Sequence, residues 1–528
     1  MNSNTISRII LLIVGIMLAV MMGNLVVSDK LSTFILFAGA AALITGIALG
    51  RNIWIILVLG HGLQLSLYVP GRPDTVLLSS AIFLGFASLM VLMRRIPWRG
   101  TIREMDILIF LIALTILQVY LRNPVGMNIF GGDSVGARPY FAIIISFAIY
   151  YFLSNWVIPP HQLKLLLKLT VMANLINFGL QIIGFFIPSV GQWYGAAAVN
   201  QNANNMDVNA VEGTQTTGLE AATRIGFLGS ASNHIARFVS SFRSPLTALL
   251  HPLWGGAILI SFAFAAMSGF RNAIISLGFT YIVGIAYRNG FAGLVVATTL
   301  VALGLGTISI TNSIHPLPAN IQRSFSFLPG TWDEDIKQSA EGSTEWRVLI
   351  WKEVMLTDRW IKNKYFGDGL GFSAQELAIQ MDIKYRSMSG QKISATGSGF
   401  DSHRDAILAN GDYHSGPIQT IRVVGYLGLA ILMLTQFRLA VHAHRQIKRC
   451  RNTEWYPLAL FVGIPLIWSP IFFVFVFGSF EIACSIVFLG AAWVKILENH
   501  LPLEPYRKLA PPLPYVNPSR ASRSAHSP

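Results

Sequence analysis

Charge is scarce in this chain of 528 residues. Only 12% of the residues are charged, whereas 53% are hydrophobic, and the mean hydropathy is +0.55. Soluble domains carry charge on about a quarter of their residues. The composition therefore excludes a soluble globule with one core. We expect an all-α polytopic membrane protein, because a helix satisfies its own backbone hydrogen bonds inside the hydrocarbon layer.

Cysteine and acidic residues are also few. Cys450 and Cys484 define neither a disulfide framework nor a metal-ligand spacing, and we assign them no chemistry. The 25 acidic residues are outnumbered by 39 Lys and Arg. The Lys and Arg residues lie mostly at the ends of apolar runs. This is the distribution that the positive-inside rule predicts for a membrane protein, and it does not indicate a nucleic-acid-binding surface. We expect no metal site, no cofactor and no nucleic-acid partner.

Long apolar runs dominate the chain. A helix needs about 17 to 25 apolar residues to cross a bilayer. Thirteen runs are evident, at residues 9–27, 31–50, 52–69, 76–93, 107–121, 139–158, 165–187, 246–267, 273–287, 291–310, 417–437, 457–477 and 480–497.

The distribution of arginine and lysine requires one more crossing. With a cytoplasmic N-terminus, thirteen spans place the basic cluster at 94–103 inside but the cluster at 438–451 outside, against the positive-inside rule. Only residues 225–242 can supply the missing span. They carry Asn233, His234 and Arg237, and a lipid-facing arginine at mid-membrane costs about 2.5 to 3.5 kcal/mol. We therefore predict about 12–14 transmembrane helices, with this one facing protein or a wet cavity.

The chain divides into five regions by composition. We predict N-terminal transmembrane helices at 1–187, an outer loop with central transmembrane helices at 188–310, and a large outer loop at 311–415. C-terminal transmembrane helices follow at 416–497. The remainder, 498–528, is rich in Pro, Ser and Arg and is expected to be a disordered cytoplasmic tail.

The large outer loop contains three local patterns. Residues 343–360 place apolar side chains near a helical period, which predicts an amphipathic helix at the membrane surface with Arg347 in its first turn. KYFGDGLGFSA at 364–374 predicts a tight glycine turn, but its spacing is not that of a P-loop. Asp333 and Asp335 have the spacing of a cation site on a diphosphate, or form a solvated acidic turn, the interpretation we favour.

Four elements follow one another between residues 224 and 437. They are RIGFLGSASNHIA at 224–236, the Ser268–Arg271 element between two spans, the arginine–tryptophan helix with KYFGDGLG, and His414-Ser415-x9-Gly425-x-x-Gly428. In this order they resemble the O-antigen ligase and polysaccharide polymerase family of bacterial envelopes, although Arg271 stands one residue further from Ser268 than is usual there.

This resemblance implies a metal-independent glycosyltransferase of GT-C-like fold in the bacterial inner membrane, with its active site on the periplasmic side. It would transfer a glycan from an undecaprenyl diphosphate carrier to an acceptor hydroxyl. Arg271 and Arg347 would hold the diphosphate, because a guanidinium presents paired donors to phosphate oxygens. His414 would act as the base or as a phosphate ligand. The substrate contacts would be Arg224, Asn233, Arg237 and Ser415.

Several functions remain open at this point. Ligation of O-antigen to a glycolipid in lipopolysaccharide biosynthesis, extension of a lipid-linked exopolysaccharide and transfer to a protein hydroxyl differ only in the acceptor. The expected partners are a lipid-linked oligosaccharide or polysaccharide donor, a glycolipid or glycan acceptor, and membrane lipid. A secondary transporter of envelope precursors should show repeated halves with broken helices at mid-membrane, which this sequence lacks. A structural assembly factor would tolerate His414→Ala.

Overall fold

A computed structural model describes most of the membrane-embedded part of the chain. The predicted span at 9–27, most of that at 31–50, the stretch 195–224 and the tail from 501 onward lie outside the described residues. The residues described are 45–66, 74–94, 103–125, 137–191, 194, 225–370, 408, 413, 415–476 and 478–500.

Within these ranges the protein is helical, with a single isolated bridge between Ser66 and Asp74. Among the described residues, seven helices are long and apolar enough to cross a membrane, which makes this an all-α multi-pass membrane protein. They are α4 (Thr75–Leu92), α5 (Glu104–Arg122), α7 (Pro160–Phe186), α14 (Arg271–Ile314), α19 (Gly416–Cys450), α20 (Tyr456–Phe475) and α21 (Phe480–His500).

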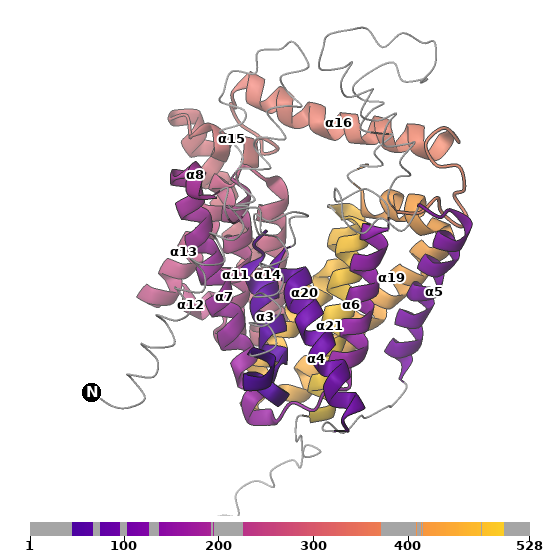
Figure 1. Cartoon of the computed structure of the whole chain (residues 1–528). Helices are drawn as coiled ribbons and strands as arrows, with labels where there is room; N and C mark the ends of the chain where they lie inside the picture. The colour runs from indigo at the N-terminus through magenta and orange to yellow at the C-terminus, as the bar shows by residue number, and fades with distance from the viewer. Residues whose placement is uncertain are drawn as a thin grey trace, which may run out of the picture.

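Shorter apolar helices stand beside these seven in one bundle (Figure 1). They are α3 (Trp54–Leu63), α6 (Arg138–Ser154), α11 (Gly226–Phe242) and α13 (Pro252–Met267). Because α21 continues to His500, the first residues of the predicted disordered tail are helical, and only the rest of that prediction is untested.

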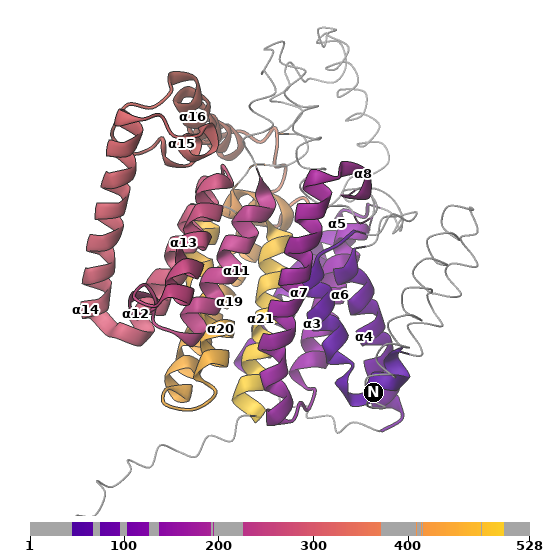
Figure 2. The same cartoon turned by 90° about the vertical axis from the view of Figure 1, so that its left-hand side faces the viewer.

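A break at Gly290 divides α14 into the two segments that the hydropathy predicts. Gly290 has φ 67° and ψ −157°, a conformation that strongly favours glycine. The segment after it rises toward α15 (Ala319–Phe325), apart from the other helices (Figure 2). Its apolar side chains are exposed, with 81% of Phe291 and 63% of Leu303 accessible. In a membrane protein such a surface faces lipid.

The basic cluster after residue 437 lies on a helix and not in a connecting loop. The apolar run ends at Phe437, but α19 continues to Cys450. Leu439, Ala443, Ile447 and Cys450 recur at helical spacing and are buried, while Arg445 and its basic neighbours are exposed. An amphipathic extension therefore carries the positive charge out of the apolar layer.

The weakly apolar crossing, α11, lies inside the bundle. It packs against α7, α13, α14 and α20. Its small residues Ala231, Ser232 and Ala236 are buried and allow close approach of the neighbouring helices. Of the two environments expected for its polar side chains, protein or a wet cavity, the structure shows contacts with protein.

The main apolar core joins α3–α7 to α19–α21. A buried ion pair crosses it, because Lys495 Nζ on α21 lies 2.7 Å from Asp106 Oδ1 on α5, and Tyr150 on α6 donates to the same oxygen at 2.6 Å. These contacts hold three helices together at the end of the bundle opposite α16 (Glu334–Leu356).

Helix α16 lies across the other end of the bundle. It runs from α15 toward α5 and the start of α19 (Figure 1). A helix is present where it was predicted, but it begins at Glu334 and ends at Leu356. Arg347 therefore lies in the middle of this helix and not, as predicted, in its first turn. Asp333 caps it by accepting the N–H groups of Asp335 and Ile336. The acidic residues of this turn thus have a structural role at a helix start.

Candidate functional site

The second half of α16 packs on the chain segment that enters α19. Ile350 and Val354 are buried against Tyr413, Ile418 and Ile421. This apolar contact joins the large outer loop to the helix that carries the Gly425-x-x-Gly428 pattern.

A hydrogen bond fixes the register of this contact. The indole Nε1 of Trp351 donates to the carbonyl oxygen of Tyr413 at 2.9 Å. Arg347 lies one helical turn before Trp351 and so shares its face. The structure therefore brings Arg347 toward the segment from Tyr413 to Ser415. His414, between them, lies outside the described residues.

Arg347 is half-buried, and burial lowers the pKa of its guanidinium from the usual value. Arginine nevertheless stays protonated in proteins. Within the described part of the chain, no hydrogen bond or ion pair to the Arg347 side chain is observed. The arrangement leaves a positive charge with donor capacity one helical turn from Trp351, the residue that bonds Tyr413.

Burial raises the pKa of Tyr413 to about 12, although nearby Arg422 opposes the shift. The Tyr413 hydroxyl therefore stays neutral at physiological pH. It cannot accept a proton from an attacking alcohol, so the candidate base of this segment remains His414. Ser415 is the N-cap residue of α19 and is 7% exposed.

A break in α19 and the glycine turn interlock. Gly425 has φ 73° and interrupts the helix, which leaves backbone groups without helical partners. The turn provides them: Asp368 N–H donates to the Arg422 carbonyl at 2.6 Å, and Tyr426 N–H donates to the Lys364 carbonyl at 2.8 Å. A Cβ on Gly425 would lie 2.1 Å from the carbonyl oxygen of Tyr365. The predicted tight turn is thus a docking element for α19.

The same turn is tied to the first half of the bundle. Arg122 Nη2 at the end of α5 donates to the carbonyl oxygens of Phe366 (2.9 Å) and Gly367 (2.8 Å). The Leu370 N–H donates to Tyr140 Oη on α6 at 2.8 Å. The loop after α16 is therefore held on three helices, which makes this end of the bundle a preorganised surface.

Sequence reasoning missed one cation here. Arg422 stands two helical turns after Ser415, in the short first segment of α19, and its charge acts on both Tyr413 and Tyr140. The seven-residue spacing from Ser415 was the available signal, because it places both residues on one face of a helix.

Arg271 lies at a different place on the same end of the bundle. It opens α14, and its Nη2 donates to Ser326 Oγ, just after α15, at 2.7 Å. Arg323 on α15 is also buried and was not singled out from the sequence. Arg271 thus lies at the α15 side of α16, whereas Arg347 stands about 20 Å along α16 at 1.5 Å per residue.

The start of α11 joins the Arg271 turn. The Ile225 N–H donates to the carbonyl oxygen of Ser268 at 2.9 Å. Arg224, the residue before it, lies outside the described residues. This backbone hydrogen bond nevertheless brings together two of the four elements described above, the one at 224–236 and the Ser268–Arg271 element.

The three polar residues of α11 make contacts inside the bundle. Asn233 Nδ2 donates to Ser276 Oγ on α14 at 2.7 Å, and His234 Nδ1 lies 3.1 Å from Asn174 Nδ2 on α7. Arg237 Nε donates to the Phe461 carbonyl on α20. For Asn233 and Arg237, proposed above as substrate contacts, these bonds supply a role in helix packing.

Comparisons with known proteins do not add to this picture. No family model matches the chain, and no curated protein matches its sequence.

Proposed function

We propose that this protein is a GT-C-like glycosyltransferase with 12–14 transmembrane helices. It moves a glycan from an undecaprenyl diphosphate carrier to an acceptor hydroxyl at the periplasmic face of the bacterial inner membrane, as the resemblance to O-antigen ligases and polymerases implies. The reaction needs a base for the alcohol and positive charge for the diphosphate leaving group.

One observation carries the proposal. The Trp351–Tyr413 hydrogen bond joins α16 to the residue that precedes His414. Arg347 lies one helical turn before Trp351, on the same face of α16. A guanidinium with unused donors beside a histidine-bearing segment, at the end of a membrane bundle, suits a lipid-held diphosphate. Arg422 adds a further positive charge next to Tyr413.

Arg271 and Arg323 form a second basic group near α15. In the proposed reaction they bind a more distant part of the donor or the acceptor. Alternatively, α16 moves to bring Arg347 toward them when substrate binds. Arg224, Asn233, Arg237 and Ser415 remain proposed substrate contacts, and the packing bonds of Asn233 and Arg237 favour an indirect role for these two.

The test is a reconstituted transfer reaction. The purified protein receives a defined undecaprenyl diphosphate glycan and either a lipid A-core acceptor or a second carrier-linked repeat unit, with and without EDTA. Product on lipid A-core identifies a ligase, and product on the carrier-linked unit identifies a polymerase. Loss of activity with EDTA would contradict a metal-independent reaction. Product on neither acceptor, with donor transported instead, would favour a transporter.

Single substitutions test the residues. Removing one preorganised donor costs about 2.7 to 4 kcal/mol, so Arg347→Ala should lower kcat by a factor of about 100 to 1,000. Lys352→Ala is the matched control, because it removes a positive charge from an exposed position of the same helix. His414→Ala should abolish transfer. Full activity in either site variant would remove that residue from the site.

A further inference from the structure

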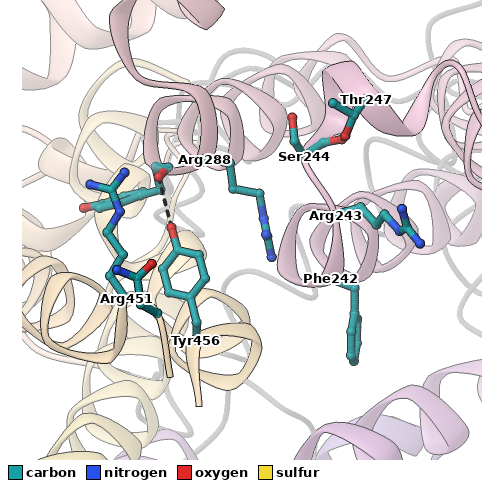
Figure 3. Close-up of a pocket in the computed structure, with 9 residues that line it drawn as sticks. Phe242, Arg243, Ser244, Thr247, Arg288, Arg451 and Tyr456 are labelled. Atoms are coloured by element: carbon teal, nitrogen blue, oxygen red, sulfur yellow. Dashed lines mark hydrogen bonds between the residues drawn. The ribbon is translucent and has the colours of Figure 1, made fainter. Parts of the chain in front are cut away.

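A second basic site lies at the end of the bundle opposite α16. A pocket of about 560 Å³ is formed where α11 ends, α14 breaks and α19 connects to α20 (Figure 3). This volume is in the range of small-molecule sites. The positive-inside rule assigns this end, with the basic extension of α19, to the cytoplasm.

The lining of the pocket carries one sign of charge. Arg243, Arg288 and Arg451 contribute to it, and no acidic residue does. The hydroxyl-bearing residues Ser244 and Thr247 complete one wall. Three guanidinium groups without a carboxylate partner in the lining repel one another, and an anion in the pocket would relieve that repulsion.

Arg288 is held in place by the end of α11. Its Nε donates to the Ser240 carbonyl at 2.9 Å and its Nη2 to the Ser241 carbonyl, two groups of the last helical turn that lack helical donors. The guanidinium also lies 5.2 Å from the centre of the Tyr456 ring. Figure 3 shows this side chain extending between Tyr456 and Phe242. These contacts leave Nη1 free of hydrogen bonds to described residues.

The other two arginines lie at the rim. Both side chains are exposed, and Arg243 lies 6.0 Å from the centre of the Trp254 ring. Arg451 follows the last residue of α19, where the chain turns toward α20. They can therefore move toward a bound anion without any change in helix packing.

We propose that this pocket binds a phosphate group. Arginine matches phosphate oxygens through paired donors, and basic pockets between helices at a cytoplasmic membrane surface are suited to anionic headgroups. The phosphate comes either from the headgroup of an anionic membrane lipid or from a soluble phosphate compound. The site is separate from the proposed transfer site and does not depend on it.

The first arm of the test measures lipid binding. Full-length protein is released from nanodiscs that contain phosphatidylglycerol in phosphatidylcholine, and native mass spectrometry counts the retained lipids. Wild-type protein should retain phosphatidylglycerol in preference to phosphatidylcholine. The double variant Arg243→Gln/Arg451→Gln should retain at least about tenfold less, because it removes two charged hydrogen-bond donors from the pocket.

The second arm measures inorganic phosphate binding by calorimetry in a neutral detergent. Phosphate binding that the double variant abolishes would identify a soluble source. Its absence, together with selective lipid retention, would identify the headgroup. Arg445→Gln is the control, since it removes an exposed positive charge from the same part of α19 outside the pocket. Equal retention in wild type and the double variant, equal loss in the control, or no binding in either arm would overturn the proposal.

Discussion

The Nε of Arg237 lies 2.5 Å from the carbonyl oxygen of Phe461, the carbonyl that Pro465 leaves without a helical donor. Proline has no N–H, so the group four residues earlier in α20 needs another partner. The guanidinium also stacks 3.8 Å from the centre of the Phe461 ring. A charged residue in a crossing helix is thus explained by a broken hydrogen bond in its neighbour.

We predict that Arg237→Met destabilises the protein by about 1 to 3 kcal/mol, the cost of an unsatisfied buried carbonyl. In a Pro465→Ala background the backbone N–H at 465 becomes available, so the same substitution should cost less. Denaturant unfolding in detergent of both single variants and the double variant measures the difference. Arg445→Met, at an exposed position, should change stability by less than about 0.5 kcal/mol. Equal costs in the two backgrounds would show that Arg237 does not serve this carbonyl.

Gly425 gives a second prediction about stability. An alanine there must adopt a backbone conformation that is almost exclusive to glycine, at about 1 to 3 kcal/mol, and its Cβ would lie 2.1 Å from the Tyr365 carbonyl oxygen. Gly425→Ala should therefore detach the glycine turn from α19, which limited proteolysis between residues 357 and 370 would detect. Gly304→Ala is the control, since that position has open space around it and should be neutral or stabilising. An undigested turn in Gly425→Ala would contradict the interlock.

The sequence predicted most of the described long helices because their apolar runs are dictated locally by the bilayer. The predicted span at 52–69 was wrong as a separate crossing, since α3 has only ten residues and is bent by 104° from the helical segment before it. Charge distribution located α11, although its hydropathy is weak, because orientation is a property of the whole chain. The break at Gly290 was also predictable, since the polar pair Arg288 and Asn289 precedes it between two apolar runs.

Other features depended on contacts between distant segments. The break at Gly425 falls inside a continuous apolar run, and only the turn near Gly367 makes it favourable. The contact of Arg237 with Phe461 also joins residues far apart in sequence, so no local pattern predicts it. Of the candidate site, the sequence identified Arg347 and Ser415 but not Arg422. The seven-residue spacing from Ser415 places Arg422 on the same helix face, but only the structure shows that its charge acts on Tyr413 and Tyr140.

The contact between α16 and Tyr413 gives a prediction about activity. Trp351→Phe keeps the apolar packing but removes the indole donor, so Arg347 should lose its fixed position. We expect transfer to fall roughly tenfold, equivalent to about 1.4 kcal/mol, and amide hydrogen exchange to rise in the second half of α16. Trp468→Phe removes an indole N–H that has no partner among the described residues and should change neither measurement. Faster exchange without loss of transfer would separate this contact from the proposed site.

The segment of α14 after Gly290 should cross the membrane completely. It runs from Phe291 to Ile314, long enough at 1.5 Å per residue for a hydrocarbon core of about 30 Å. Phe291→Cys and Ile314→Cys, at positions 81% and 80% exposed, should react with a membrane-impermeant thiol reagent from opposite sides. The native Cys450 and Cys484 are buried and should add little background. Labelling of both positions from one side would mean that this segment lies along the membrane surface, and the large outer loop would then be on the side of the basic clusters.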